Sequence, residues 1–333
     1  MGGKNDDGID NFIGFYSAEG FWVDERIDVL DIKNEYRLAG IVPEISVWLD
    51  AEHFSAAVCV DGLMLLHVRE LAATVPTMGD PAQFDAGVRW WDEHIHYANA
   101  MQICLESESI AHEPNSSEIM TAAVWQTETV RVGFQGRNPV RRAMSIGPSV
   151  IATRFEAANW SRGEGTAPVE AISTGWTNWN VVPEDVVVSG LTKFEQVCTD
   201  PVLVKRLSFV AKAKSAYGRN DFAVAFTLLW FVIESAAKDM LAQSIPSKFA
   251  AKSRSHQSIH VVFAELKSEG SISDNLFALL ENCRKLRNRM MHQSESTVCM
   301  PSDCRMAADA AVAIAVRKAS LGIRMKWQCG VEF

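Results

Sequence analysis

The spacing of hydrophobic and polar residues changes partway along this 333-residue chain. Near the end of its first half, residues 128–134 (Glu-Thr-Val-Arg-Val-Gly-Phe) alternate with the period of two that is typical of a β-strand. A proline beside an acid, at Pro43-Glu44 and again at Asp80-Pro81, is typical of a helix start, so helices are predicted from 43 and from 80 to about 107. Two weaker strand candidates are 150–155 and 186–188. This part of the chain is therefore expected to mix helices and strands.

From about residue 200 onward, apolar residues recur with the period of 3.6 that is typical of amphipathic helices. The run from Phe222 to Ile233 is apolar on nearly all sides, which predicts a central helix. The predicted helices are 201–217, 221–243, 258–267, 273–292 and 303–324. The candidate N-caps are Asn220, Ser273 or Asp274, and Ser302. The expected fold class is α+β, with a mixed α/β module at 1–197 followed by an all-α domain at 198–333.

Charge divides the chain at nearly the same place. The formal net charge is −9, which by itself disfavours a nucleic-acid partner. Residues 1–199, however, carry 13 Lys and Arg against 29 Asp and Glu, whereas residues 200–333 carry 19 against 12. An acidic module joined to a basic one suggests two domains with different partners, although two ordinary solvated surfaces would give the same numbers.

Targeting and membrane signals are not apparent. The first ten residues are polar and acidic, unlike a signal peptide, and the longest uncharged apolar run, Phe222 to Ile233, is far shorter than the ~20 residues that cross a bilayer. Seven cysteines occur without a CxxC pair, which disfavours a zinc site and fits reduced thiols. We therefore expect a cytoplasmic protein with no membrane contact.

Histidine and tryptophan pairs give only weak site signals. His94 and His96 are two apart and diverge by about 200° on a helix, so they cannot share a metal, and one or both are expected to lie on the surface. His256 and His260 are four apart and could share a face, but no third ligand is apparent. Trp176 and Trp179 could form a stacking platform or, more commonly, buried anchors. No metal and no cofactor are therefore predicted.

One segment has a pattern that suits chemistry on RNA: Cys-Arg-Lys-Leu-Arg-Asn-Arg-Met-Met-His at 283–292. Metal-free RNA cleavage uses the 2′-hydroxyl as nucleophile and needs a proton-transfer group and a cation on the phosphate, which His and Arg supply. On a regular helix Asn288 and His292 share a face, about 40° apart, whereas Arg287 and His292 lie about 140° apart. Arg287 and His292 can act on one phosphate if the helix end unwinds, or if a second copy of the chain contributes groups across a two-fold axis.

This segment resembles the R-x(4–6)-H motif of the HEPN superfamily, with a polar residue directly after the arginine. The preceding apolar helix, Ala-Phe-Thr-Leu-Leu-Trp-Phe-Val-Ile-Glu-Ser at 225–235, has a similar order and spacing in many members, so the resemblance covers about residues 200–325. It implies a four- to five-helix bundle that dimerises through the motif helices. It also implies a metal-independent endoribonuclease with a role in antiviral defence, abortive infection or toxin–antitoxin systems.

The resemblance also implies roles for individual residues. Arg287 would bind the scissile phosphate, His292 would be the acid/base group, and Asn288 would orient the histidine or the phosphate. Glu234 and Lys238 resemble a supporting Glu-x3-Lys pair of some members. The expected RNA-binding cations are Arg284, Lys285, Arg289, Lys252 and Arg254. The module at 1–197 would bind a trigger, an antitoxin or another protein partner.

Two other interpretations of 198–333 remain open. In the first, an HEPN-like dimer binds nucleotide or nucleic acid, or acts as a scaffold in a larger complex, without catalysis. In the second, Arg287 and His292 only stabilise a helix end, where cations complement the helix dipole.

Overall fold

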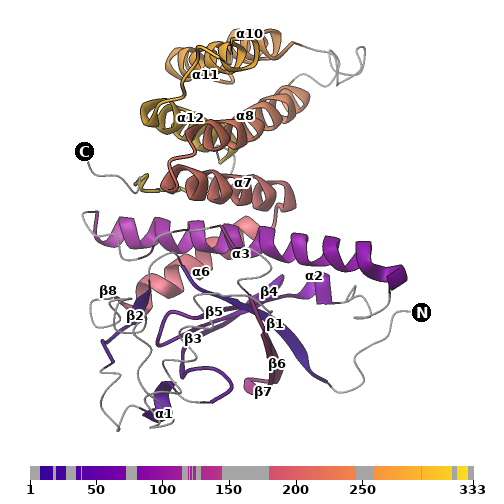
Figure 1. The fold of residues 1–333 in the computed structure, drawn as a ribbon, viewed down its shortest axis with the longest axis vertical. Helices are drawn as coiled ribbons and strands as arrows, with labels where there is room; N and C mark the ends of the chain where they lie inside the picture. The colour runs from indigo at the N-terminus through magenta and orange to yellow at the C-terminus, as the bar shows by residue number, and fades with distance from the viewer. Residues whose placement is uncertain are drawn as a thin grey trace. The chain divides into compact units, whose positions relative to one another are not determined.

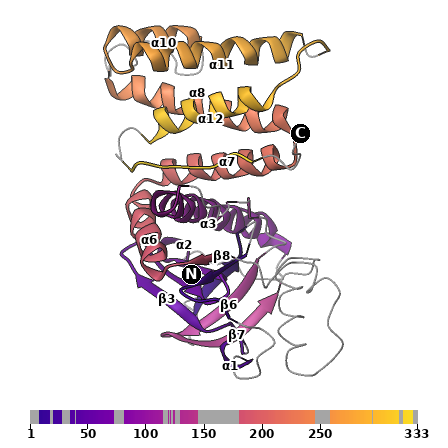
Figure 2. The same cartoon turned by 90° about the vertical axis from the view of Figure 1, so that its left-hand side faces the viewer.

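A computed structural model describes residues 8–17, 20–27, 35–38, 40–72, 81–114, 119, 121, 123–124, 129–144, 180–244, 258–293, 295–316 and 321–328. The α+β class predicted from the sequence is confirmed (Figures 1 and 2). The chain forms two compact units: unit 1 is Met1–Ser208 with Arg324–Lys326, and unit 2 is Phe209–Ile323 with Trp327–Phe333. Their boundary falls inside helix α7 (Pro201–Gly218). The domain boundary at 197/198 stays a sequence-based prediction.

Unit 1 is built on a curled antiparallel sheet with the strand order β3-β4-β5-β1-β6-β7. Its strands are β1 (Asp10–Phe15), β3 (Ile45–Asp50), β4 (Phe54–Cys59), β5 (Met64–Val68), β6 (Val130–Gln135) and β7 (Asn138–Met144). Strands β2 (Phe21–Val23) and β8 (Asn180–Val182) form a separate parallel pair. One face of the large sheet holds a core cluster that includes Phe12, Leu65 and Phe134. Strands β4 and β5 are buried along their whole length, which fits their uninterrupted apolar sequence.

Two long helices lie across the other side of this sheet: α3 (Phe84–His112) and α6 (Glu184–Cys198) (Figure 1). The shorter elements of unit 1 are α1 (Glu35–Leu38), α2 (Arg69–Ala72) and the 3-10 turn Pro81–Gln83. Phe54 of β4 packs against Phe194 of α6, with ring centroids 4.8 Å apart. The two long helices cross closely at Gly190, where a Cβ would lie 2.9 Å from the Cα of Leu105. This glycine therefore sets how near α6 can come to α3.

Unit 2 is a helical bundle. Its helices after α7 are α8 (Phe222–Ser244), α10 (Ile259–Ser268), α11 (Asp274–His292) and α12 (Pro301–Ala315). Figures 1 and 2 show α8 beside α12 in one layer, and α10 beside α11 in the next. Helix α8 contacts each of the other three, as its nearly continuous apolar surface predicts. Within the described residues, no helix is both long and apolar enough to cross a membrane.

Two predictions for unit 1 were wrong. Residues after Pro43-Glu44 form strand β3, not a helix, because Ile45, Val47 and Trp48 favour extended backbone and pair with β4. Residues 186–188 lie in α6, not in a strand: buried positions recur at helical spacing through Leu191, and acids occupy the first turn. The strand at 128–134 is confirmed as β6, and the strand predicted at 150–155 lies outside the described residues.

The helices predicted at 201–217, 221–243, 258–267 and 273–292 are confirmed to within two residues, but two caps were wrong. Asn220 adopts a left-handed backbone (φ 63°), and Asp221 caps α8 instead by accepting a hydrogen bond from the Val224 N–H at 3.2 Å. Ser302 lies inside α12, which begins at Pro301 and ends at Ala315, well before 324.

Candidate functional site

Helix α11 carries the motif residues, and its start and inner face are fixed by local interactions. Ser273 caps the helix as predicted: its hydroxyl oxygen accepts a hydrogen bond from the Leu276 N–H at 3.2 Å. Leu280, Cys283 and Leu286 are buried at helical spacing along the inner face. The helix packs against α8, α10 and α12. Packing therefore holds α11 in place while its last turns present polar side chains.

The three motif residues sit differently. Arg287 and Asn288 are partly buried and in contact, with Nη1 of Arg287 donating to Oδ1 of Asn288 at 3.3 Å, whereas His292 is exposed. Because α-helical backbone continues to His292, Arg287 and His292 project about 140° apart around the helix axis. One copy of α11 therefore does not bring the arginine and the histidine together, while Asn288 and His292 share a face.

An open cavity of about 660 Å³ lies beside the motif. Lys285, Asn288 and Arg289 line it from α11, and Asp303 and Met306 line it from α12. Asp303 already holds the start of α12, because its Oδ2 accepts a hydrogen bond from the Met300 N–H at 2.9 Å. The two cations and the amide of Asn288 can together hold an anionic group.

Arg284, expected to bind RNA, lies in an ion pair instead of lining this cavity. Its Nε and Nη2 groups each donate to a carboxylate oxygen of Glu281 at 2.9 Å. These hydrogen bonds lower the pKa of Glu281 and raise that of Arg284. Nδ1 of His260, from α10, lies 3.0 Å from the same carboxylate. The arginine and Glu281 thus help to join α11 to α10.

The supporting pair predicted on α8 is formed. Nζ of Lys238 lies 2.5 Å from Oε1 of Glu234, whose Oε2 accepts a hydrogen bond from the indole N–H of Trp230 at 3.1 Å. Both side chains of the pair are about one-third exposed. The pair therefore lies at the surface of α8, where an ion pair one turn apart contributes only about 0.3–0.5 kcal/mol.

Several predicted residues lie outside the described part of the chain: Lys252, Arg254, His256, Trp176 and Trp179. His260, which could share a helix face with His256, contacts Glu281. Among the described residues, no group of three or more His, Cys, Asp and Glu side chains is arranged to hold a metal ion.

The expectation that one or both of His94 and His96 lie on the surface was wrong. Both are buried in α3, with exposed fractions of 2% and 6%. Nδ1–H of His94 donates to the Trp90 carbonyl at 2.8 Å, and Nδ1 of His96 lies 2.9 Å from Oγ of Ser208. Two histidines on opposite sides of a helix are both buried because α3 is enclosed on nearly every side from His94 to Ser107. The mixed polar and apolar sequence of this stretch does not predict that both faces of the helix are buried.

Further polar residues of α3 bind the segments around them through hydrogen bonds, and no sequence pattern indicated this role. Oδ1 of Asn99 accepts a hydrogen bond from the Val124 N–H at 2.8 Å. The buried carboxylate of Glu106 accepts hydrogen bonds from the N–H groups of Thr121 and Lys326, both at 3.0 Å. Oγ of Ser107 accepts one from the Arg324 N–H at 3.0 Å. Residues 324–326 are therefore attached to unit 1 through α3.

The burial of His94 should make unit 1 sensitive to mild acid. Burial lowers the pKa of His94 to about 4, from 6.5 in the unfolded chain. The unfolded state therefore binds more protons between pH 6.5 and pH 4, and stability falls as the pH falls through this window. From pH 7 to pH 5 we expect this group to remove about 2 kcal/mol. Urea unfolding at both pH values should show a correspondingly shallower pH dependence in His94→Gln; equal pH dependence in both proteins would contradict the assignment.

In comparisons with known proteins, no family model, curated protein or solved structure matches the chain.

Proposed function

We propose that the protein is a metal-independent endoribonuclease of HEPN type, which cleaves single-stranded RNA at a composite site formed by two copies of α11. The observation that carries the proposal is the arrangement at the end of this helix. Arg287 is held by Asn288, His292 is exposed on the same face as Asn288, and a cavity lined by Lys285 and Arg289 adjoins them. A cation, a proton-transfer group and a cavity lined by further cations thus lie within or beside two turns of one helix.

Each group has a distinct role in the proposed reaction. The guanidinium of Arg287 would bind the scissile phosphate and stabilise the charge that develops on it. The imidazole of His292 would transfer protons between the 2′-hydroxyl and the leaving 5′-oxygen. Attack by the 2′-oxygen on phosphorus forms a cyclic phosphate and breaks the bond to the 5′-oxygen, which leaves as a hydroxyl. Hydrogen bonding by Asn288 would fix the position of Arg287.

The angle between Arg287 and His292 supports a site shared by two copies. A regular helix keeps the two side chains about 140° apart, so one copy does not place both on one phosphate. In a two-fold dimer, the arginine of one copy can face the histidine of the other. Met291, next to His292, is 64% exposed and would contribute one apolar side chain to such a contact.

A second candidate function is RNA or nucleotide binding without cleavage. The cavity supports it, because Lys285, Asn288 and Arg289 line the cavity, whereas Arg287 and His292 do not. Its cations could hold a phosphate with no acid/base group at hand. In either case unit 1 would be the regulatory module, binding a trigger, an antitoxin or another protein partner, in keeping with a defence or toxin role.

The two functions are separated by incubating the full chain with single-stranded RNA in EDTA and analysing the ends of any fragments. We expect fragments with 2′,3′-cyclic phosphate and 5′-hydroxyl ends. Binding without cleavage, lost in Lys285→Ala/Arg289→Ala but retained in His292→Ala, would favour the second function. Fragments with 5′-phosphate ends, or cleavage abolished by EDTA, would contradict the proposed mechanism.

A further inference from the structure

Two arginines in the sheet of unit 1 converge on one uncharged oxygen. Nε of Arg131 (β6) and Nη2 of Arg141 (β7) both lie 3.3 Å from Oδ1 of Asn11 (β1). In the sheet register Asn11 faces Gly133, and Gly133 faces Arg141, so the three lie on one side of neighbouring strands. Arg131 pairs with Ile13, two residues further along, and projects from the same side. The two guanidinium groups therefore share a small area of the sheet.

Gly133 makes this convergence possible. A Cβ at this position would lie 2.7 Å from Cγ and 2.9 Å from Nε of Arg141. The side chain of Arg141 thus passes directly over the backbone of β6 on its way to β1. Any other residue at 133 would occupy the same space, so the sequence of β6 supplies the gap that holds the Arg141 guanidinium beside Arg131.

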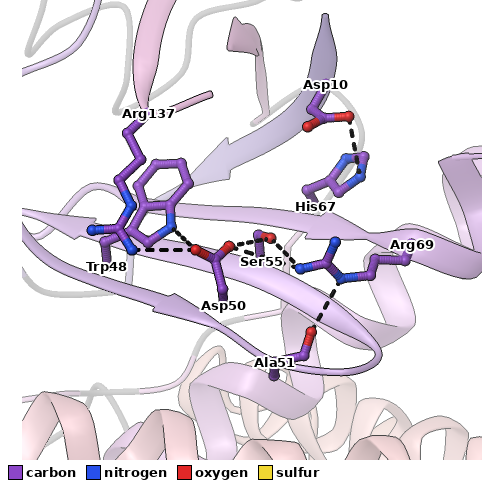
Figure 3. Close-up of polar contacts among 8 residues, drawn as sticks. All are labelled: Asp10, Trp48, Asp50, Ala51, Ser55, His67, Arg69 and Arg137. Carbon is purple, nitrogen blue, oxygen red and sulfur yellow. Dashed lines mark hydrogen bonds and ion pairs between the residues drawn. The ribbon is translucent and has the colours of Figure 1, made fainter. Parts of the chain in front are cut away.

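Two arginines beside this sheet, Arg69 at the start of α2 and Arg137 in the turn between β6 and β7, are bound differently. Figure 3 shows Asp50 between Arg137 and Ser55: its carboxylate accepts from Arg137 at 3.3 Å and from the Ser55 hydroxyl at 2.7 Å. Arg69 donates to the Ala51 carbonyl at 3.1 Å and lies 3.8 Å from the same carboxylate. Each of these cations thus has a negatively charged neighbour, although both lie on an exposed part of the surface.

Arg131 and Arg141, in contrast, have no carboxylate partner within the described residues. Burial, and then the charge of Arg141, lower the pKa of Arg131. Two like charges are therefore held together, one of them partly buried, in a unit whose sequence is strongly acidic. Together the two guanidinium groups carry ten N–H donors, of which the Asn11 oxygen takes two. Within the described part of the chain, no carboxylate accepts from the remaining donors, which an anion could therefore occupy.

We propose that Arg131 and Arg141 form a binding site for the phosphate group of a small-molecule ligand. A tetrahedral dianion presents several oxygens and can accept hydrogen bonds from two guanidinium groups that approach from different strands, whereas one arginine suffices for a planar carboxylate. Bound phosphate would also cancel the repulsion between the two arginines. This site belongs to unit 1 and does not depend on the proposed nuclease of unit 2.

The test measures phosphate binding by calorimetry with the full chain, at constant ionic strength in chloride. All variants are made in a background protein that carries Lys285→Ala/Arg289→Ala, so that the cavity beside α11 does not contribute to the measured phosphate binding. Arg131→Gln and Arg141→Gln should each raise the Kd for inorganic phosphate at least about tenfold, whereas Arg137→Gln, which removes a neighbouring cation outside the site, should leave it unchanged. Acetate should bind more weakly than phosphate. The proposal would be overturned if Arg137→Gln lost as much phosphate affinity as the two site variants, or if acetate bound as tightly as phosphate.

Thermal unfolding of the same proteins gives a second readout that a folding defect cannot imitate. Without phosphate, Arg141→Gln should unfold at the same temperature as the background protein or higher, because it relieves repulsion. With phosphate at about ten times its Kd, the background protein should gain about 3 °C, and Arg141→Gln should gain none. If phosphate stabilises both proteins equally, the arginine pair is not the site.

Discussion

Replacing His292 with alanine should reduce RNA cleavage by about 10²- to 10⁴-fold, and Arg287→Ala by about 10²- to 10³-fold. The first range is typical of losing a general acid/base group, and the second of losing a charge that stabilises the transition state. His292 is exposed, and Arg287 is partly buried with one side-chain hydrogen bond, to Asn288, so each substitution should cost no more than about 1–2 kcal/mol and both variants should stay folded. The rate of RNA cleavage in EDTA, measured beside the melting temperature, checks both statements.

Arg305→Ala is the matched control, because it removes one exposed positive charge from the neighbouring helix α12, outside the cavity lining. Mixing the two inactive variants then tests the composite site. If the arginine of one copy works with the histidine of the other, re-associated mixed dimers contain one intact site, and about a quarter of the wild-type rate should return. No recovery despite demonstrated subunit exchange would rule out the shared site. Unchanged cleavage in either single variant would remove that residue from the mechanism.

The second large effect is expected at Gly190, where α6 crosses α3. A Cβ there would lie 2.9 Å from the Cα of Leu105, a backbone atom that cannot turn aside. Gly190→Leu would force the two helices apart and separate the packing of Phe194 on Phe54. We expect a loss of about 3–4 kcal/mol in unfolding free energy, at the upper end of the cost of overpacking. Urea unfolding followed by circular dichroism measures it.

Gly218→Leu provides the comparison, because it introduces the same side chain at the exposed end of α7. A Cβ at Gly218 would meet only the Gln328 carbonyl oxygen, at 3.8 Å. The substitution should change stability by no more than about 0.5 kcal/mol. If both leucine variants were equally stable, the contact between α3 and α6 would not depend on the missing side chain.

Sequence patterns predicted the helices of unit 2 well and the strands of unit 1 poorly. Helix α11 has a strong local signal, with an apolar stripe between the Ser273 cap and a cationic last turn. Strand β3 has no such local signal. The proline and acid directly before it are typical of a helix start, and its pairing with β4 is what makes it a strand. The three consecutive valines of α6 show the reverse, since the helix depends on packing against α3 and the sheet. Local propensity is decisive where tertiary contacts do not compete with it.

The candidate sites divide in the same way. Arg287, Asn288 and His292 were found because they lie within six residues of one helix. The contributions of Asp303 and Met306 to the cavity come from another helix, and no spacing rule predicts them. The convergence of Arg131 and Arg141 on Asn11 depends on strand order and register, which join residues 120 and 130 positions apart. The burial of His96 likewise depends on Ser208, 112 residues away.

The attachment of residues 324–326 to α3 has a consequence for any attempt to divide the protein. Glu106 and Ser107 receive their hydrogen bonds from backbone groups that lie after the whole of α8, α10, α11 and α12 in the sequence. A gene cut once near residue 200 would therefore produce an N-terminal fragment whose buried Glu106 carboxylate has lost one of its N–H donors, and such a loss is costly. Splitting this chain needs two cuts, or a linker that returns a short C-terminal peptide to unit 1.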